Sequence, residues 1–128
     1  MSHTKSQTTL VIGLSLLGLA VLIGAFGAHG LKNFVTPEKL ITFETGVRYH
    51  FYHAFGIVLV GLLQQLFSDI KITRAYFLFL AGILLFSFNC YLYVITGEKI
   101  FAMIVPIGGT SFAAGWFDLA WKIHRFRN

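Results

Sequence analysis

One segment decides the fold of this chain, TPEKLITFETGVRYHFYHAFGIVLVGLLQQL at residues 36–66. Its first half is polar and aromatic and holds His50 and His53, whereas the part from Ala54 onward is a nearly unbroken apolar run. An amphipathic start followed by an apolar continuation is typical of a helix that enters a membrane from its surface layer. We expect residues 37–48 to lie in the headgroup layer and residues 45–66 to span the membrane.

The start of this helix is marked by three consecutive residues. Thr36 can cap a helix with its side chain, Pro37 has the φ angle of a first helical position, and Glu38 suits the positive end of the helix dipole. We therefore predict a helix that begins at residue 37.

Three further apolar stretches lie at residues 9–28, 75–96 and 100–121, and Asp118 is their only charged residue. About 20 apolar residues match a hydrocarbon layer about 30 Å thick. A signal peptide is the alternative for residues 9–28, but its apolar length favours a retained helix because signal h-regions are shorter. The predicted fold class is all-α: one domain, an integral membrane four-helix bundle with both termini on the same side.

Composition supports a membrane protein and no nucleic-acid partner. Hydrophobic residues make up 56% of the chain and charged residues 12%, against about 45–50% hydrophobic in soluble domains. The net charge of +5 comes from residues scattered at the ends of the apolar stretches, a pattern that fits membrane orientation. We expect membrane lipids as partners, with a homo-oligomer or a partner membrane protein as further options, and no cofactor.

The distribution of basic residues predicts the orientation. The predicted side with the termini holds six Lys and Arg residues and the opposite side four, and cytoplasmic loops are the richer ones. Both termini are therefore expected in the cytoplasm. The six are Lys5, Lys71, Arg74, Lys122, Arg125 and Arg127, and the four are Lys32, Lys39, Arg48 and Lys99.

A candidate polar pocket lies near the start of the second predicted helix. Thr45, Tyr49 and His53 recur every four residues and so share one helix face. His29 enters the same layer from the end of the first predicted span. We interpret these four residues as a ligand-binding pocket, and the alternative is that they hydrogen-bond one another and neighbouring carbonyls to fix helix packing.

Two further chemistries are weighed for the same segment. Glu44 and Arg48, spaced i, i+4, are expected to form an interfacial ion pair. His29, His50 and His53 are a weak alternative as metal ligands, since no HExxH motif, Cys pair or acidic cluster accompanies them. Our prediction for this segment is no metal site.

Asp118 is the only acid within a predicted span. It can pair with Lys122 at i+4, and a buried proton relay is the alternative. The chain shows no phosphate-binding glycine loop and no Ser/His/Asp grouping, so no catalytic residue is predicted and we do not expect an enzyme.

Small residues indicate where helices approach closely. Gly24, Gly27 and Ala28 give the first span a smooth face, and Pro106 precedes the pair Gly108 and Gly109 in the fourth. We predict that these six residues contribute to helix packing.

These residues together resemble a known family. The segments Gly24-Ala25-Phe26-Gly27-Ala28-His29 and Pro106-Ile107-Gly108-Gly109-Thr110, with Tyr49, His53, Tyr91 and Gly115-Trp116, are similar to small bacterial membrane proteins of unknown function related to eukaryotic transmembrane protein 256. The resemblance covers nearly the whole chain. It implies a four-span bundle in the bacterial cytoplasmic membrane and matches His29, Tyr49 and His53, whereas Glu44, Arg48 and His50 fall where the family varies.

The predicted function is a non-enzymatic binding or interaction module. Its outward polar pocket would take a lipid headgroup, a small amphiphile or a partner helix. The alternative is a small transporter or metal-handling protein that uses His29 and His53. A transporter needs a continuous polar path, and residues 57–63 supply none.

Overall fold

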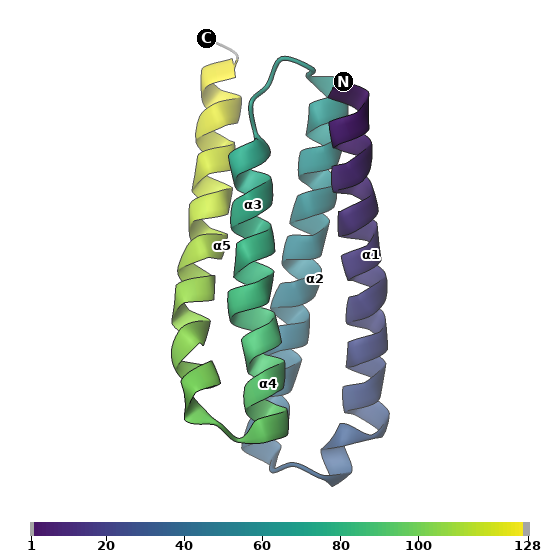
Figure 1. Cartoon of the computed structure of the whole chain (residues 1–128), viewed down its shortest axis with the longest axis vertical. Helices are drawn as coiled ribbons and strands as arrows, with labels where there is room; N and C mark the ends of the chain where they lie inside the picture. Colours follow the sequence, from purple (N-terminus) through teal and green to yellow (C-terminus); the bar gives the residue numbers. More distant parts are fainter. Residues whose placement is uncertain (1, 127–128) are drawn as a thin grey trace.

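The computed structural model describes residues 2–126, which form an antiparallel bundle of four long helices (Figure 1). Its elements in chain order are α1 (Ser2–His29), η1 (Leu31–Asn33), α2 (Pro37–Leu66), α3 (Thr73–Gly82), η2 (Ile83–Ser87), α4 (Phe88–Thr96) and α5 (Lys99–Phe126). Within residues 2–126 there is no strand, which confirms the predicted all-α class. Helix α1 begins and helix α5 ends at the same end of the bundle.

The predicted start of α2 is confirmed. The Thr36 hydroxyl oxygen accepts a hydrogen bond from the Lys39 N–H at 3.3 Å, and Pro37 is the first helical residue. The expected interfacial and spanning parts therefore form a single helix.

Elements α3, η2 and α4 run on as one helix, Thr73–Thr96. Its middle turn, η2, is π-helical, and the Phe88 N–H bonds to the Ile83 carbonyl. The Asn89 side-chain amide donates to the Leu84 carbonyl at 2.9 Å and to the Leu85 carbonyl at 3.1 Å. These bonds satisfy carbonyls at the wide turn. The helix ends at Gly97, whose φ of 73° is left-handed and suits glycine.

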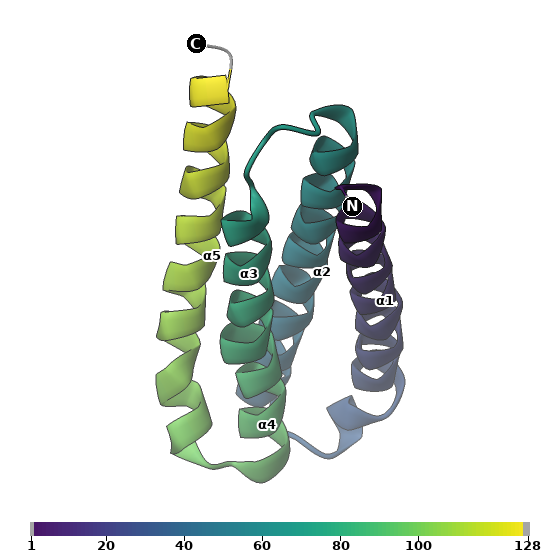
Figure 2. The ribbon, with the colours of Figure 1, turned by 45° about the horizontal axis from the view of Figure 1, so that its top comes forward.

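The helices stand in the order α1, α2, α3 with α4, then α5, as both Figure 1 and Figure 2 show. Helix α1 packs chiefly against α2, and α5 packs chiefly against α3, η2 and α4. The Ser111 hydroxyl of α5 donates to the Leu78 carbonyl of α3 at 2.7 Å. This arrangement leaves α2 and α5 to approach each other only through their side chains.

Glycines set the closest approaches between helices. A Cβ on Gly108 would clash with the backbone of Phe86, and one on Gly27 would clash with the Phe43 ring. Gly24 lies in ordinary contact with Val47, and Gly109 lies farther from its neighbours. Among the other predicted packing residues, Ala28 and Pro106 are exposed, so their faces of α1 and α5 do not meet a helix of this chain.

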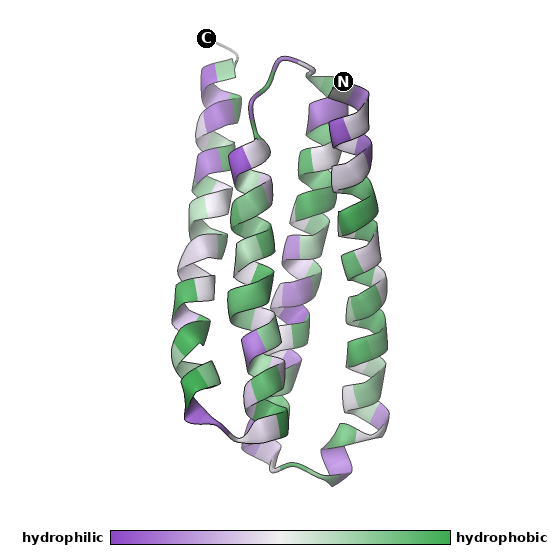
Figure 3. Cartoon of the chain, viewed as in Figure 1, coloured by the Kyte–Doolittle hydropathy of each residue, from purple (hydrophilic) through white to green (hydrophobic). Residues whose placement is uncertain are grey.

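Among the described residues, three helical stretches are long and apolar enough to cross a membrane by length and composition: His3–Asn33, Thr73–Thr96 and Lys99–Phe126. Figure 3 shows their mainly apolar colouring. Helix α2 has 30 residues and lies along α1 and α3, but its charged and histidine residues lower its hydropathy. Its packing alongside three apolar stretches supports the prediction that it also spans.

Candidate functional site

His53 of α2 is bound at both ring nitrogens. Its Nδ1–H donates to the Tyr49 carbonyl at 2.7 Å, and Nε2 accepts a hydrogen bond from Trp116 Nε1 of α5 at 3.0 Å. Its ring stacks on Phe112 at a centroid distance of 3.4 Å, and only 3% of the residue is exposed. An imidazole with one donor and one acceptor nitrogen is neutral. His53 therefore ties α2 to α5 and has no nitrogen left for a ligand.

The predicted stripe is found on one face of α2, but its chemistry is mainly aromatic. Tyr49 packs on Phe86 and stacks with His53, at centroid distances of 4.7 and 6.0 Å. The Thr45 hydroxyl donates to the Ile41 carbonyl of its own helix at 2.9 Å. In these contacts the stripe residues bond to α2 itself and pack against η2.

His29 does not join this stripe. Gly24 faces Val47 and Gly27 faces Phe43, so the antiparallel register sets His29 level with about residue 42. His53 lies eleven residues farther along α2, or about 16 Å at 1.5 Å per residue. His29 is exposed, and within residues 2–126 no hydrogen bond links it to Tyr49 or His53.

His50, which the sequence pattern places only among the weak metal-ligand alternatives, is a buried polar residue of α2. Its Nδ1 shares a hydrogen bond with the Tyr91 hydroxyl of α4 at 2.9 Å, and the residue is fully buried. Nε2 has no partner in hydrogen-bonding geometry, although the Leu16 carbonyl of α1 is near. The sequence signal for the burial of His50 is Gly46, one turn earlier on the same face of α2. A glycine there indicates that another helix packs closely against this face.

The metal alternative is corrected by these positions. His50 faces α4, His53 faces α5 and His29 lies at the bundle end. The described part of the chain contains no group of three or more His, Cys, Asp or Glu residues placed to hold a metal.

Two predicted ion pairs are also corrected. Glu44 and Arg48 are both exposed and form no ion pair in the described structure, and an exposed pair of this kind gains little energy. Asp118 pairs with Arg74 of α3 at 3.5 Å instead of with Lys122. The antiparallel packing of α3 on α5 brings Arg74 and Asp118 to the same level, whereas Lys122 lies one turn nearer the helix end.

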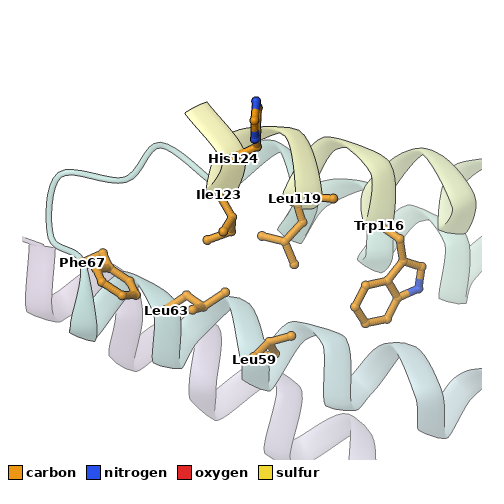
Figure 4. Close-up of a pocket in the computed structure, with 8 residues that line it drawn as sticks. Leu59, Leu63, Phe67, Trp116, Leu119, Ile123 and His124 are labelled. Atoms are coloured by element: carbon orange, nitrogen blue, oxygen red, sulfur yellow. The ribbon is translucent and has the colours of Figure 1, made fainter. Parts of the chain in front are cut away.

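An apolar groove lies between α2 and α5 near the end with the termini (Figure 4). Leu59, Leu63 and Phe67 on one side point toward Leu119 and Ile123 on the other, and Trp116 closes one end. The groove has a volume of about 890 Å³. We call it the α2–α5 groove; its lining is Leu59, Leu63, Phe67, Trp116, Leu119, Ala120, Ile123 and His124.

The end of α5 beside the groove is basic. Lys122, His124 and Arg125 follow one another within its last two turns, and the Arg125 guanidinium lies over the Trp121 ring at 5.6 Å. Lys71 lies in the neighbouring loop between α2 and α3. Arg127, counted in the predicted charge asymmetry, lies outside the described residues.

The fold defines a small all-α membrane protein. The chain belongs to the family described as "Protein of unknown function (DUF423)", whose model matches residues 23–109. This match confirms the resemblance to small bacterial membrane proteins of unknown function. It includes Tyr49 and His53 and ends before Trp116.

Several relatives of this chain are named as membrane proteins. The UPF0382 membrane protein YwdK of Bacillus subtilis (strain 168) is 43% identical over 99 residues, which cover 77% of this chain and 80% of the relative. The UPF0382 membrane protein SH2409 of Staphylococcus haemolyticus is 32% identical over 91% of this chain and 95% of its own. A UPF0382 membrane protein of Haemophilus influenzae is 36% identical over 79% and 81%. No solved structure matches the chain.

Proposed function

We propose that this protein is a non-enzymatic membrane module that binds an anionic phospholipid, with an acyl chain in the α2–α5 groove. The observation that carries the proposal is the combination of an apolar groove, closed at one end by Trp116, with a basic helix end at the other. The groove replaces the polar pocket of His29, Thr45, Tyr49 and His53 as the binding site, because His53 is already fully bonded.

The size and lining of the groove support an acyl chain. Its volume of about 890 Å³ lies in the range of about 300–1,000 Å³ typical of small-molecule sites. Its walls are leucine, isoleucine and aromatic side chains, and Figure 4 shows them directed toward one another. An acyl chain offers no hydrogen bonds and needs none from such walls.

The charge at the mouth supports an anionic headgroup. Lys122 and Arg125 lie in the last turns of α5, and Lys71 in the adjacent loop. Each basic residue near a membrane surface contributes about 1 kcal/mol of attraction to anionic lipid. A lipid whose headgroup lies at this end would extend its chain toward Trp116. The proposed location is the bacterial cytoplasmic membrane with both termini in the cytoplasm, where such lipids face Lys71 and Lys122.

Native mass spectrometry after reconstitution in vesicles of mixed phosphatidylglycerol and phosphatidylcholine tests the proposal. Ala120 lines the groove, so Ala120→Trp should fill it and reduce retained phosphatidylglycerol by about tenfold, a loss of about 1.4 kcal/mol. Ala114→Trp is the matched control, because Ala114 is exposed on the same helix outside the groove. Equal retention by the two variants would contradict the proposed site, and equal retention of both lipids would contradict the headgroup preference.

A further inference from the structure

The charged residue placed deepest along the bundle is Arg48 of α2. Contacts of Gly24 with Val47 and of Gly27 with Phe43 set Arg48 level with Ile23 of α1. Gly46 meets Cys90 and Tyr91, which sets Arg48 level with about Phe88 of α4. Within residues 2–126, the neighbouring helices carry no charged residue at this height, and their polar residues there are Ser87 and Asn89.

The depth of Arg48 follows from the positions of other charges at the same end. On the neighbouring elements the next charges are Lys32 after α1 and Glu98 after α4, nine and ten residues beyond the level of Arg48, whereas on α2 itself Glu44 and Lys39 precede Arg48 by four and nine residues. At 1.5 Å per residue, the helical turn that carries Arg48 lies about 14 Å from the level of Lys32 and Glu98. A charged side chain within a membrane layer faces a partner or a polar cavity, because lipid chains supply no counter-charge.

Arg48 nevertheless lies on the exposed arc of α2. Ile41, Arg48 and Phe55 repeat every seven residues on this arc, and Tyr52 lies beside them. Ile41 is 63% exposed, Tyr52 52% and Phe55 60%. Glu44 is exposed one turn below Arg48, and no ion pair of the described structure includes either residue. This arc thus carries one acid and one base that the single chain leaves unpaired.

We propose that this arc, which we call the α2 face, binds a second copy of the chain. A two-fold axis along the membrane normal would set the two α2 helices side by side in the same direction, with Glu44 of each copy against Arg48 of the other. A two-fold interface must be self-complementary, and an acid and a base one turn apart meet that requirement. Helix side chains lean toward the N-terminus, so Arg48 leans toward the level of Glu44.

The charges favour this occupant over lipid alone. Lipid can cover Ile41 and Phe55. If Arg48 lies below the headgroups, deeper than the interfacial placement expected for residues 37–48, only a protein side chain can offer it a carboxylate. An arginine has five donors, so it can bind the partner's Glu44 while its own lies one turn below. The proposal concerns the half of α2 near η1 and is independent of the α2–α5 groove, whose α2 wall begins at Leu59.

Charge-reversal variants test the reciprocal pairing in the full chain. Two differently labelled populations are reconstituted in phosphatidylethanolamine–phosphatidylglycerol vesicles, and energy transfer between them measures association. Arg48→Glu alone and Glu44→Arg alone should each weaken association by about tenfold or more, because each puts like charges across the two-fold axis. Mixing these two variants should restore it, since each supplies the charge that the other lacks. Lys32→Glu is the matched control for charge reversal off the α2 face and should associate like the wild type.

The trans-complementation step separates association from folding. Recovery in the mixture requires both variants to be folded and paired across the interface. Any one of three outcomes would overturn the proposal. The wild-type protein could stay monomeric, the single variants could associate like the wild type, or the folded mixture could fail to recover association.

A second measurement keeps the wild-type charges. Tyr52→Cys should form a disulfide between copies in the membrane, whereas Phe117→Cys, 76% exposed on α5, should not. The native Cys90 is buried and stays in both variants. Cross-linking at residue 117 but not at residue 52 would place the contact elsewhere and reject the α2 face.

Discussion

The indole N–H of Trp116 donates to Nε2 of His53 at 3.0 Å and joins two helices that make few backbone approaches to each other. The same indole closes the α2–α5 groove. The bond between helices therefore also sets where the groove ends.

Trp116→Phe should destabilise the protein by about 1–3 kcal/mol, because it keeps an aromatic ring but leaves buried Nε2 of His53 without a donor. Thermal unfolding in detergent measures the effect as a lower Tm. Trp121→Phe is the control, since Trp121 is exposed and its indole makes no hydrogen bond in the described residues. An equal Tm for both variants would show that the His53–Trp116 bond contributes no net stability.

Gly108→Ala should destabilise the bundle by about 1–3 kcal/mol or more, because the new Cβ would meet the Phe86 backbone, which cannot turn away as a side chain can. Gly18→Ala is the matched control, as its Cβ would meet nothing within 4 Å. That control should be neutral or slightly stabilising in a helix. Unfolding in a denaturing detergent compares the two, and equal loss of stability would contradict the close approach of α5 to η2.

Topology can be tested by labelling. A reporter fused after Asn128 should behave as cytoplasmic, and a cysteine at exposed Asn33 should react with a membrane-impermeant reagent added outside intact cells. The reason is the excess of Lys and Arg at the end with the termini. Reaction at residue 33 only after permeabilisation would reverse the proposed orientation.

The sequence predicted the features that depend on local chemistry. Thr36 and Pro37 mark the start of α2 because capping involves only neighbouring residues. The stripe of Thr45, Tyr49 and His53 followed from helical spacing alone. The all-α bundle with both ends together followed from four apolar stretches, since antiparallel helices are the simplest way to connect them.

Partners distant in the chain were not predicted. His53 binds Trp116, 63 residues away, and no periodicity links the two. Asp118 was assigned to Lys122 because spacing on one helix was the only available guide, whereas Arg74 reaches it from another helix. The sequence also places His29 and His53 in one layer, which is wrong. It shows that α2 begins at Pro37 but not which residue of α2 lies beside each residue of α1.

The π-helical turn Ile83–Ser87 inserts one extra residue into a helix that is otherwise regular. Removing one residue there would return the helix to α-geometry and rotate everything after it by about 100°. Tyr91 would then swing away from His50, and Cys90 away from Gly46. The single surplus residue thus corrects the rotation of the helix, so that the residues before and after the π-helical turn both pack against α2 and α5 within one continuous helix.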